Sequence, residues 1–440
     1  MERYRLPRTG LFLIPIMFLM MSFQSAFADE TCQSPYMPKI VGQEDYVYII
    51  TVGVAGMGDG SDKLVTIGVN PKKETYGKII SVASVGGRHE FHHGGLTDDR
   101  RYLWAGGLDK SKIFIFDLAT DPANPKVANV IENYAKVTGG VVGPHTMYAL
   151  PGRMIIANLS NSKDYSGRTA LTEFTNDGKF IRTIWMPDDA PFGYDIRVNA
   201  RLNRMLTSSF TGRNNYMRNL KEVVEDENAM NNDSGNEVVL WDLHARKPLQ
   251  IFKTPGFPLE IRWALMPQHN YAFVHAAAGN TIYLIDRQED GTFASKPIID
   301  LSDPKDPEKA MITGDISLSA EDKYLFVAFI FEGTTSIYDV SDPHNPKPVI
   351  THQKIGGQIN MISQSWDGKR IYFTSSSLSK WDAMKEDGTY LDQYFKSYSW
   401  DGKKLDHLFT VDFLKEDLGL AHLMRFGQDR FYKNLLPPAE

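Results

Sequence analysis

The chain has 440 residues, of which 42% are hydrophobic, 12% aromatic and 23% charged. This composition excludes a disordered, collagen-like or coiled-coil protein, and the presence of a single cysteine, Cys32, excludes a disulfide-stapled scaffold. With 48 basic and 54 acidic residues and no long run of Lys or Arg, the chain offers nucleic acid no basic face. Its length suffices for two or three ordinary domains or for one large closed β-architecture.

The N-terminus has the pattern of an export signal. Three arginines precede an apolar run of 13 residues, Leu11–Phe23, and Ala26-Phe27-Ala28 fits the small-x-small cleavage rule. A membrane anchor is the alternative, but a helix of that length spans about 20 Å, short of the ~30 Å hydrocarbon core. No later stretch approaches transmembrane length. We therefore predict a cleaved signal peptide over residues 1–28 and a single exported domain over residues 29–440.

Nearly every segment with a clear hydrophobic period alternates with period two and is rich in Val, Ile, Tyr and Phe, which is typical of β-strands. Turns of the Asp-Gly-Lys type separate several of these segments, and only residues 215–227 favour a helix of any length. The sequence therefore predicts an all-β chain. Examples of the predicted strands are Tyr46–Val52, Leu64–Val69, Lys112–Leu118, Arg153–Leu159, Glu237–Leu243, Tyr271–His275, Thr281–Asp286, Tyr324–Phe331 and Arg370–Ser375.

A weak internal repeat narrows the fold further. Thr97–Val127 and Ser319–Val349 each contain an acidic turn, a strand, a second strand ending in Asp, and then Asp-Pro-x-Asn-Pro. Hairpins that repeat in this way predict a β-propeller, with a β-sandwich or two stacked barrels as the alternative. Seven blades would average about 58 residues each, more than the usual ~40–50. We therefore expect loop insertions, at Asn161–Arg168 and at Arg213–Ser234.

Two motifs resemble known sites but lack the context that those sites need. The glycine-rich stretch Gly53–Gly60 is followed by a strand, whereas a dinucleotide-binding turn must open a helix. His89-Glu90-Phe91-His92-His93 reads as His-Glu-x-x-His, but glycines on both sides leave too few residues for the helix of a zinc peptidase. We interpret the first as a hairpin loop and do not expect peptidase chemistry from the second.

The histidines are the strongest candidates for a metal site. Three of the eleven, His89, His92 and His93, lie within five residues of one another. Consecutive residues of a regular strand face opposite sides, so His92 and His93 can reach one ion only if the backbone bends there, and the neighbouring glycines favour such a bend. His145 and His422 are further candidates; the alternative is that all are ordinary channel imidazoles bonded to backbone carbonyls.

The stretch Glu90-Phe91-His92-His93-Gly94-Gly95 resembles the Glu-Leu-His-His-Ser-Gly motif of the selenium-binding protein family, which includes methanethiol oxidases. The resemblance is collinear over nearly all of the chain after residue 28. It continues through Ile113–Asp117, His145-Thr146, Phe192-Gly193-Tyr194-Asp195, Pro258-Leu259-Glu260-Ile261-Arg262, Ile312–Ile316, Leu325–Pro346, Gly356–Thr374, Ser379-Lys380-Trp381-Asp382 and Ala421-His422.

This resemblance implies a propeller enzyme that carries copper on histidines. It implies oxidation of methanethiol, or of a similar small thiol, by O2 and water to formaldehyde, hydrogen sulfide and hydrogen peroxide, in an exported and hence periplasmic protein. Glu90 is a candidate catalytic residue that could orient an imidazole or accept a proton, and Tyr148, which replaces a family histidine, could ligate the metal or relay a proton. The copper ligands carried over by motif are His92, His93, His145 and His422.

Three departures from the family pattern bear on function. The cysteine pair that vertebrate-type members place after the double histidine is replaced by Thr97-Asp98-Asp99-Arg100, so no selenium or thiol adduct can form there. Tyr148 and Leu265-Met266 stand where family members have histidines. These losses leave a non-catalytic secreted propeller that binds copper or a protein partner as an alternative, with a propeller hydrolase as a third hypothesis. Asp195, Glu260, Arg262 and Asp315 fit either catalysis or structural ion pairs between blades.

Overall fold

The computed structural model describes residues 34–35, 42–303, 305–307 and 309–429. The predicted signal peptide, its cleavage site and Cys32 lie outside the described residues. Within the described part, no helix is both long enough and apolar enough to cross a membrane.

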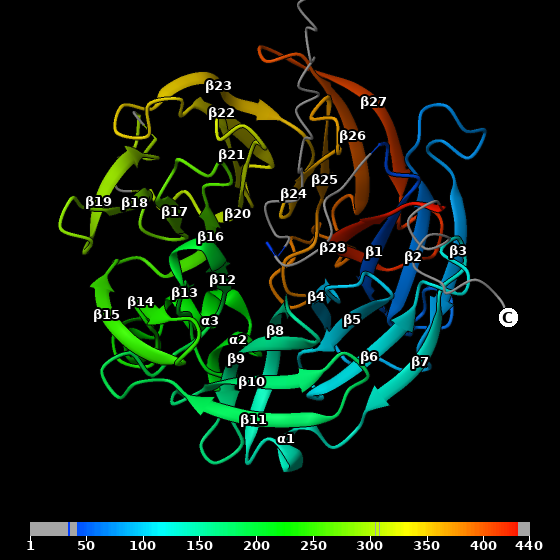
Figure 1. Cartoon of the computed structure of the whole chain (residues 1–440). Helices are drawn as coiled ribbons and strands as arrows, with labels where there is room; N and C mark the ends of the chain where they lie inside the picture. The colour runs from blue at the N-terminus through cyan, green and yellow to red at the C-terminus, as the bar shows by residue number, and fades with distance from the viewer. Residues whose placement is uncertain (1–33, 36–41, 304, 308, 430–440) are drawn as a thin grey trace, which may run out of the picture.

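Seven four-stranded antiparallel sheets stand as blades around a central axis (Figure 1). This arrangement confirms the prediction of an all-β, seven-bladed propeller. Blades 1 to 3 consist of β28 (Leu420–Gly427), β1 (Tyr46–Val52), β2 (Lys63–Gly68) and β3 (Ile79–Ser84); β4 (Phe91–Leu96), β5 (Tyr102–Gly107), β6 (Lys112–Asp117) and β7 (Lys126–Ile131); and β8 (Val141–Leu150), β9 (Arg153–Asn161), β10 (Ala170–Thr175) and β11 (Phe180–Trp185).

The remaining four blades follow in chain order, and each begins with its innermost strand. Blades 4 and 5 consist of β12 (Ile196–Asn199), β13 (Arg204–Thr207), β14 (Glu237–Asp242) and β15 (Lys247–Lys253); and β16 (Pro258–Trp263), β17 (Tyr271–Ala276), β18 (Thr281–Arg287) and β19 (Phe293–Asp300). Blades 6 and 7 consist of β20 (Thr313–Leu318), β21 (Tyr324–Phe329), β22 (Thr334–Asp339) and β23 (Lys347–Lys354); and β24 (Ile362–Gln364), β25 (Arg370–Thr374), β26 (Tyr394–Trp400) and β27 (Leu405–Asp412).

Blade 1 joins the two ends of the described chain. Its innermost strand, β28, is the last strand among the described residues and pairs antiparallel with β1. The backbone N–H of Asp45 extends this pairing by donating to the carbonyl of Gly427 at 2.9 Å. The innermost strand β4 therefore lies between β28 and β8, and residues from the beginning and the end of the chain meet at the axis.

The hydrophobic core lies between neighbouring blades. Trp104 of blade 2 packs edge-on against Phe174 of blade 3 with 6.2 Å between ring centroids, and Trp263 of blade 5 shares a cluster with Leu206 of blade 4. The innermost strands β4 and β8 are buried along their whole length, whereas the outermost strand β7 is mostly exposed. Because the inner strands are buried on both faces, the polar and charged side chains that they hold at the axis must be hydrogen-bonded or paired.

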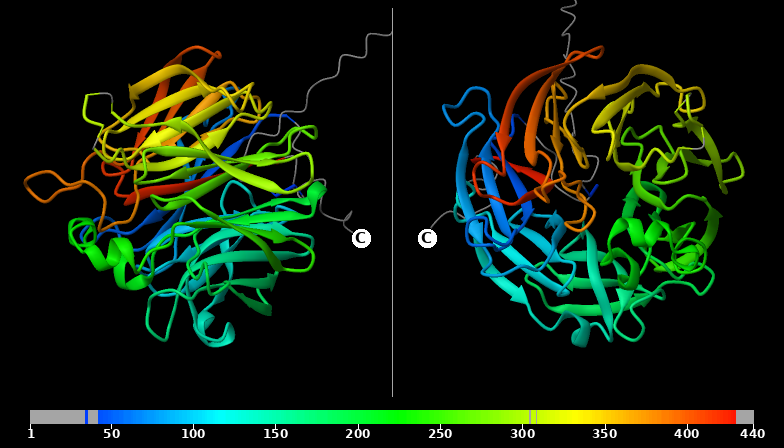
Figure 2. Two further views of the ribbon diagram at one scale, coloured as in Figure 1. Left: turned by 90° about the vertical axis from the view of Figure 1, so that its left-hand side faces the viewer. Right: turned by 180° about the vertical axis from the view of Figure 1, so that it is seen from behind.

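Helices are confined to the loops. α1 (Tyr134–Val137) and the 3-10 turn η1 (Ala200–Leu202) are single turns, and both expected insertions are present, after β9 and between β13 and β14. The second insertion contains α2 (Arg213–Tyr216), α3 (Leu220–Val224) and α4 (Glu227–Asn231). Figure 2 (left) shows these helices, in green, on the same face of the ring as the long loop between β25 and β26, in orange.

The expectation of one continuous helix over 215–227 is wrong. Asn219 and Asp226 interrupt it, because each side chain accepts hydrogen bonds from the backbone N–H groups that follow and so starts a new helix. Two other interpretations are confirmed: the glycine-rich stretch Gly53–Gly60 joins the hairpin strands β1 and β2, and the His-Glu-x-x-His sequence enters the strand β4 rather than a helix.

Candidate metal centre

A β-bulge turns the double histidine toward the axis. Phe91 pairs with Gly107 and Gly94 pairs with Ala105, so β4 takes three steps where β5 takes two, with His92 and His93 in between. The bend expected from the glycines is thus present. Its glycines are needed for close packing, since a Cβ on Gly94 would lie 2.4 Å from the carbonyl oxygen of Trp104.

The same device recurs in other innermost strands. β8 bulges at His145 and Thr146, and β28 bulges between Ala421 and Met424, where His422 lies. A bulge re-aims side chains that the alternation of a regular strand would separate. Three neighbouring blades therefore present their histidines to one point on the axis.

The four imidazoles form one compact cluster. His92 stacks on His422, and His93 stacks on His145, each with 3.9 Å between ring centroids. The ring centroids of the pairs His92–His93, His92–His145 and His93–His422 lie 4.9–5.2 Å apart. Ligand atoms of His92, His93 and His145 all lie within 4.8 Å of one another, so these three could hold a metal ion, and His422 lies directly against them.

Backbone carbonyls fix the tautomer of two of the rings. Nδ1 of His145 lies 3.0 Å from the carbonyl oxygen of Tyr194, and Nδ1 of His422 lies 2.7 Å from that of Ser376. Because a carbonyl oxygen can only accept, each Nδ1 carries the proton and each Nε2 keeps a lone pair. Both Nε2 atoms are buried and have no hydrogen-bond partner in the described part of the chain, as expected for metal-binding nitrogens.

Burial keeps the whole cluster neutral. It lowers the pKa of His145 to about 3 and that of His422 to about 4. Burial, together with the neighbouring imidazoles, lowers the pKa values of His92 and His93 well below the usual range. Neutral imidazoles are the form that binds metal ions.

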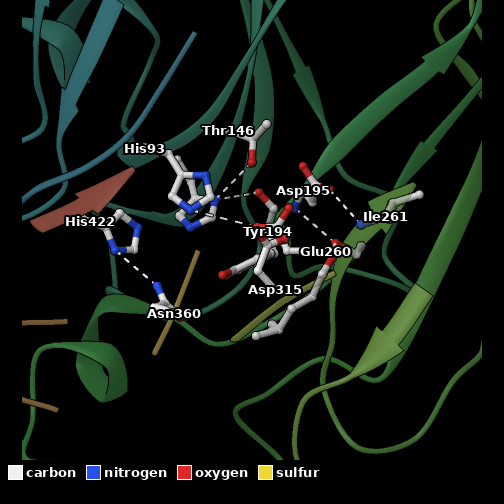
Figure 3. A network of polar contacts seen from close by, with 12 residues as sticks. His93, Thr146, Tyr194, Asp195, Glu260, Ile261, Asp315, Asn360 and His422 are labelled. Carbon is white, nitrogen blue, oxygen red and sulfur yellow. Dashed lines mark hydrogen bonds and ion pairs between the residues drawn. The ribbon is translucent and has the colours of Figure 1, made fainter. Parts of the chain in front are cut away.

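A network of buried charges lies beside the cluster (Figure 3). One carboxylate oxygen of Glu260, Oε2, accepts from Arg262 at 2.9 Å and from Arg197 at 3.1 Å. Arg197 also pairs with Asp195, and Arg262 donates to Asp315 at 2.5 Å. Burial would raise the pKa of Glu260, but the two arginines lower it to about 2.

This network also ties the blades together. The carboxylate of Asp195 accepts from the backbone N–H of Ile261 in the next blade, and that of Asp315 accepts from Ile362 in the blade after its own. Burial raises the pKa of each of these two aspartates to about 7. The aspartates therefore serve as links between blades, whereas Glu260 directs its second oxygen, Oε1, toward His93 at 3.9 Å.

An apolar chamber adjoins the histidines. It has a volume of about 120 Å³, and His92 and His145 form part of its wall. Most of the other lining side chains are aliphatic or aromatic, and among the described residues no Asp, Glu, Lys or Arg lines it. An engineered apolar cavity of about 150 Å³ stays dry and binds benzene, so the chamber suits a small apolar molecule next to the cluster.

The sequence matches the family of 56 kDa selenium-binding proteins over residues 27–430. The chain belongs to this family. It is 48% identical over 423 residues to a methanethiol oxidase of Ruegeria pomeroyi, with 93% of this chain and 95% of that protein covered. It is 49% identical over 405 residues to a methanethiol oxidase of a Hyphomicrobium species, with 91% of each chain covered. The prediction of a methanethiol oxidase-like member of the family is confirmed.

A solved structure supports the fold of this family member. The X-ray structure of a hypothetical selenium-binding protein from Sulfolobus tokodaii superimposes with a TM-score of 0.76 at 23% identity, covering 91% of this chain and 97% of that one. At that identity the likeness concerns the fold alone.

The two catalytic candidates, Glu90 and Tyr148, make their main contacts with residues other than the four imidazoles. Both carboxylate oxygens of Glu90 bind Ser379, one accepting from its backbone N–H and the other from its hydroxyl, each at 2.7 Å. Tyr148 packs in the core between blades 3 and 4, with the guanidinium of Arg197 5.7 Å from its ring centroid. A catalytic role for either residue stays a prediction.

Some of the residues that shape the site carry no signal of their own in the sequence. The carbonyls of Tyr194 and Ser376 fix two tautomers, and a backbone carbonyl is independent of residue type. The ring of Tyr194 also covers His145 at 4.0 Å. Tyr194 belongs to a motif of the family resemblance, but only the three-dimensional packing indicates what the residue does.

Proposed function

We propose that the protein is an exported, copper-dependent oxidase of methanethiol or a similar small thiol. In this reaction one thiol, one O2 and one water give formaldehyde, hydrogen sulfide and hydrogen peroxide. The observation that carries the proposal is the cluster of four neutral imidazoles beside a chamber without charged side chains. The names of the two bacterial relatives support the choice of substrate.

The donor set favours copper among the common metals. Imidazole nitrogens suit copper, and Cu(II) is at the top of the divalent affinity series for nitrogen sites. When bound, copper supplies a centre that binds thiolate sulfur and exchanges electrons with O2. His92, His93, His145 and His422 would hold it.

The surrounding residues would bind the substrate and exclude water. The chamber is large enough for a methyl group and offers it apolar contacts. The carbonyls of Tyr194 and Ser376 hold the protons of His145 and His422 away from the site. Glu90 would act at a distance, by fixing the loop at Ser379 that borders the chamber at Leu378.

Metal analysis paired with product assays tests the proposal. Purified protein without a histidine tag should contain about one copper per chain, and methanethiol should yield hydrogen sulfide with uptake of O2. His92→Ala and His422→Ala should abolish turnover, whereas His407→Ala, in the outer strand β27, should not. Normal turnover after all copper has been removed would contradict the proposal.

The non-catalytic alternative is favoured by one observation, the replacement of family histidines by Tyr148 and Leu265-Met266. It expects tight copper binding without hydrogen sulfide production in the same assay. Export to the periplasm is a separate proposal that depends on the N-terminal sequence. N-terminal sequencing of the protein recovered from the periplasm should begin at Asp29, and an intact Met1 on cytoplasmic protein would contradict it.

A further inference from the structure

In the loop that carries Ser379-Lys380-Trp381-Asp382, Ser379 holds Glu90, but Trp381 has no role in the function proposed so far. The loop lies between β25 and β26, on the face of the ring that also carries α2–α4 (Figure 2, left). Trp381 joins these two elements, because its Nε1–H donates to the carbonyl of Arg218 at 3.0 Å. Its ring lies edge-on to Phe210, which lines the chamber, at 5.8 Å.

A second hollow opens on the outside of this contact. It lies between α3 and the loop around Lys380 and shares three lining side chains with the chamber: Leu220, Val224 and Trp381. Two apolar side chains at this hollow are half-exposed, Val224 at 51% and Met384 at 50%. Lys221, Lys380 and Asp382 also line this outer hollow. The apolar part of the path therefore begins at the three shared side chains and continues through the chamber to the histidines.

We propose that Leu220, Val224 and Trp381 form the gate through which substrate reaches the metal centre, and that this gate admits small uncharged thiols. This inference rests on the proposed function for its substrate. A thiol with an ordinary pKa above 8 is mostly uncharged at pH 7, so it can cross the apolar path. Thiols that carry a carboxylate or ammonium group would be buried among side chains that offer them no counter-charge.

The gate predicts selectivity by charge and by size. The wild type should oxidise methanethiol with a kcat/KM at least about 100-fold above that for cysteine. Trp381→Ala should raise the kcat/KM for 1-butanethiol relative to methanethiol by about 10-fold or more, because removing the indole widens the narrowest point. Trp381→Phe, which keeps a ring but loses the bond to Arg218, should have a smaller effect.

The matched control is Trp185→Ala, which removes a tryptophan that is 41% exposed on the outermost strand β11. This variant should leave the kcat/KM ratio of 1-butanethiol to methanethiol unchanged. An unchanged ratio in a folded, copper-loaded Trp381→Ala variant would overturn the gate. Anaerobic mixing of thiols with copper-loaded protein provides a readout without turnover, since thiol that reaches the copper alters its visible spectrum.

This second readout separates the two proposals. If the spectral changes depend on Trp381 but no hydrogen sulfide forms, the oxidase proposal is contradicted and the gate proposal is supported. If methanethiol is turned over but the kcat/KM ratio of 1-butanethiol to methanethiol does not change in Trp381→Ala, the gate proposal is contradicted and the oxidase proposal is supported. If methanethiol leaves the spectrum of wild-type protein unchanged, the gate is wrong.

A different observation concerns His93. Unlike His145 and His422, it has its Nε2 next to a carboxylate, Glu260 Oε1, at 3.9 Å. Both atoms are buried and, within the residues that the structure describes, neither has a hydrogen-bond partner. Two arginines hold the other oxygen of Glu260 and thereby fix the direction of Oε1.

We infer that Glu260 is a positioning residue for the metal centre. Its charge, 3.9 Å from His93 Nε2, favours the tautomer with the proton on Nε2. That tautomer would leave Nδ1 of the ring as the nitrogen that binds metal, and the carboxylate would place a negative charge beside the ion. Carboxylates that hold ligand imidazoles in this way change metal affinity by about 10–100-fold.

Glu260→Gln should weaken copper binding by about 10–100-fold in competition with a chelator and should shift the EPR spectrum of the Cu(II) protein. The control is Glu173→Gln, a buried carboxylate on β10 that is held by Arg153, Arg182 and Arg246; it should change neither. Because Glu260 acts through His93, adding Glu260→Gln to His93→Gln should cause no further loss.

Wild-type affinity and spectrum in Glu260→Gln, or losses that add in the double variant, would overturn the assignment. If Glu260→Gln does not fold, Glu260→Asp retains the charge for the two arginines while withdrawing it from His93. That variant should still weaken copper binding, and unchanged binding would contradict the inference.

Discussion

At the scale of single residues, the site depends on imidazoles that stay uncharged because they are buried. Each such imidazole lowers the free energy of unfolding in acid, because in acid it binds a proton in the unfolded chain but not in the folded protein. His275 shows this apart from the candidate ligands: it is buried on β17, its Nδ1 bonds Thr313 at 2.7 Å, and burial lowers its pKa to about 3.

Acid should therefore weaken the metal-free protein, in part through His275. Its folded pKa lies below the unfolded value of about 6.5, so its contribution is complete above that pH and is lost as the pH falls toward 3. Between pH 7 and pH 5 this residue should account for about 2 kcal/mol of the free energy of unfolding. Denaturant titrations should show a shallower pH dependence for His275→Gln than for the wild type. Equal slopes would show that His275 is not held neutral.

At the scale of elements, the bulged innermost strand is the unit that builds the site. The sequence was sufficient to predict strands from period two and a bend from the glycines beside His92 and His93. It did not predict the three short helices, because the capping preference of Asn219 and Asp226 outweighs a periodic pattern in so short a segment. The partner of Glu90 was also beyond reach, since Ser379 lies 289 residues further along the chain.

Gly94→Ala tests the bulge of β4. The added Cβ would meet the carbonyl oxygen of Trp104 at 2.4 Å and a side-chain carbon of Ile50 at 2.5 Å, so the backbone beside His93 must shift. We expect a loss of about 1–3 kcal/mol in the free energy of unfolding together with weaker copper binding. Gly388→Ala strains a turn with positive φ but meets nothing within 4 Å. It should leave copper binding as in the wild type, and if Gly94→Ala does so too, the close packing at the bulge is unimportant.

At the scale of the whole molecule, the closure of the ring brings β28, near the C-terminal end of the described residues, to the first blades. The candidate ligands come from blades 1, 2 and 3, so a bound ion would link β28 to β4 and β8. The family resemblance identified these histidines by motif. Their distance from one another, and the tautomers set by Tyr194 and Ser376, depend on contacts between residues far apart in sequence, and one sequence does not reveal these.

Copper should therefore stabilise the closed ring. Ligand that binds only the folded state at about 1,000 times its Kd adds about 4 kcal/mol, so Tm should rise by several degrees when copper is added. His422→Ala removes the contribution of β28 and should weaken copper binding at least about tenfold, with a smaller rise in Tm. His407→Ala should behave like the wild type. An equal rise in the His422→Ala protein would show that β28 takes no part in the site.

The convergence of the four histidines on one copper ion can be measured directly by X-ray diffraction from copper-loaded crystals at the copper absorption edge. We expect a single strong anomalous peak on the propeller axis, within bonding distance of nitrogens of His92, His93, His145 and His422. A peak at another place in the ring, or a cluster without copper in protein that turns over methanethiol, would contradict it.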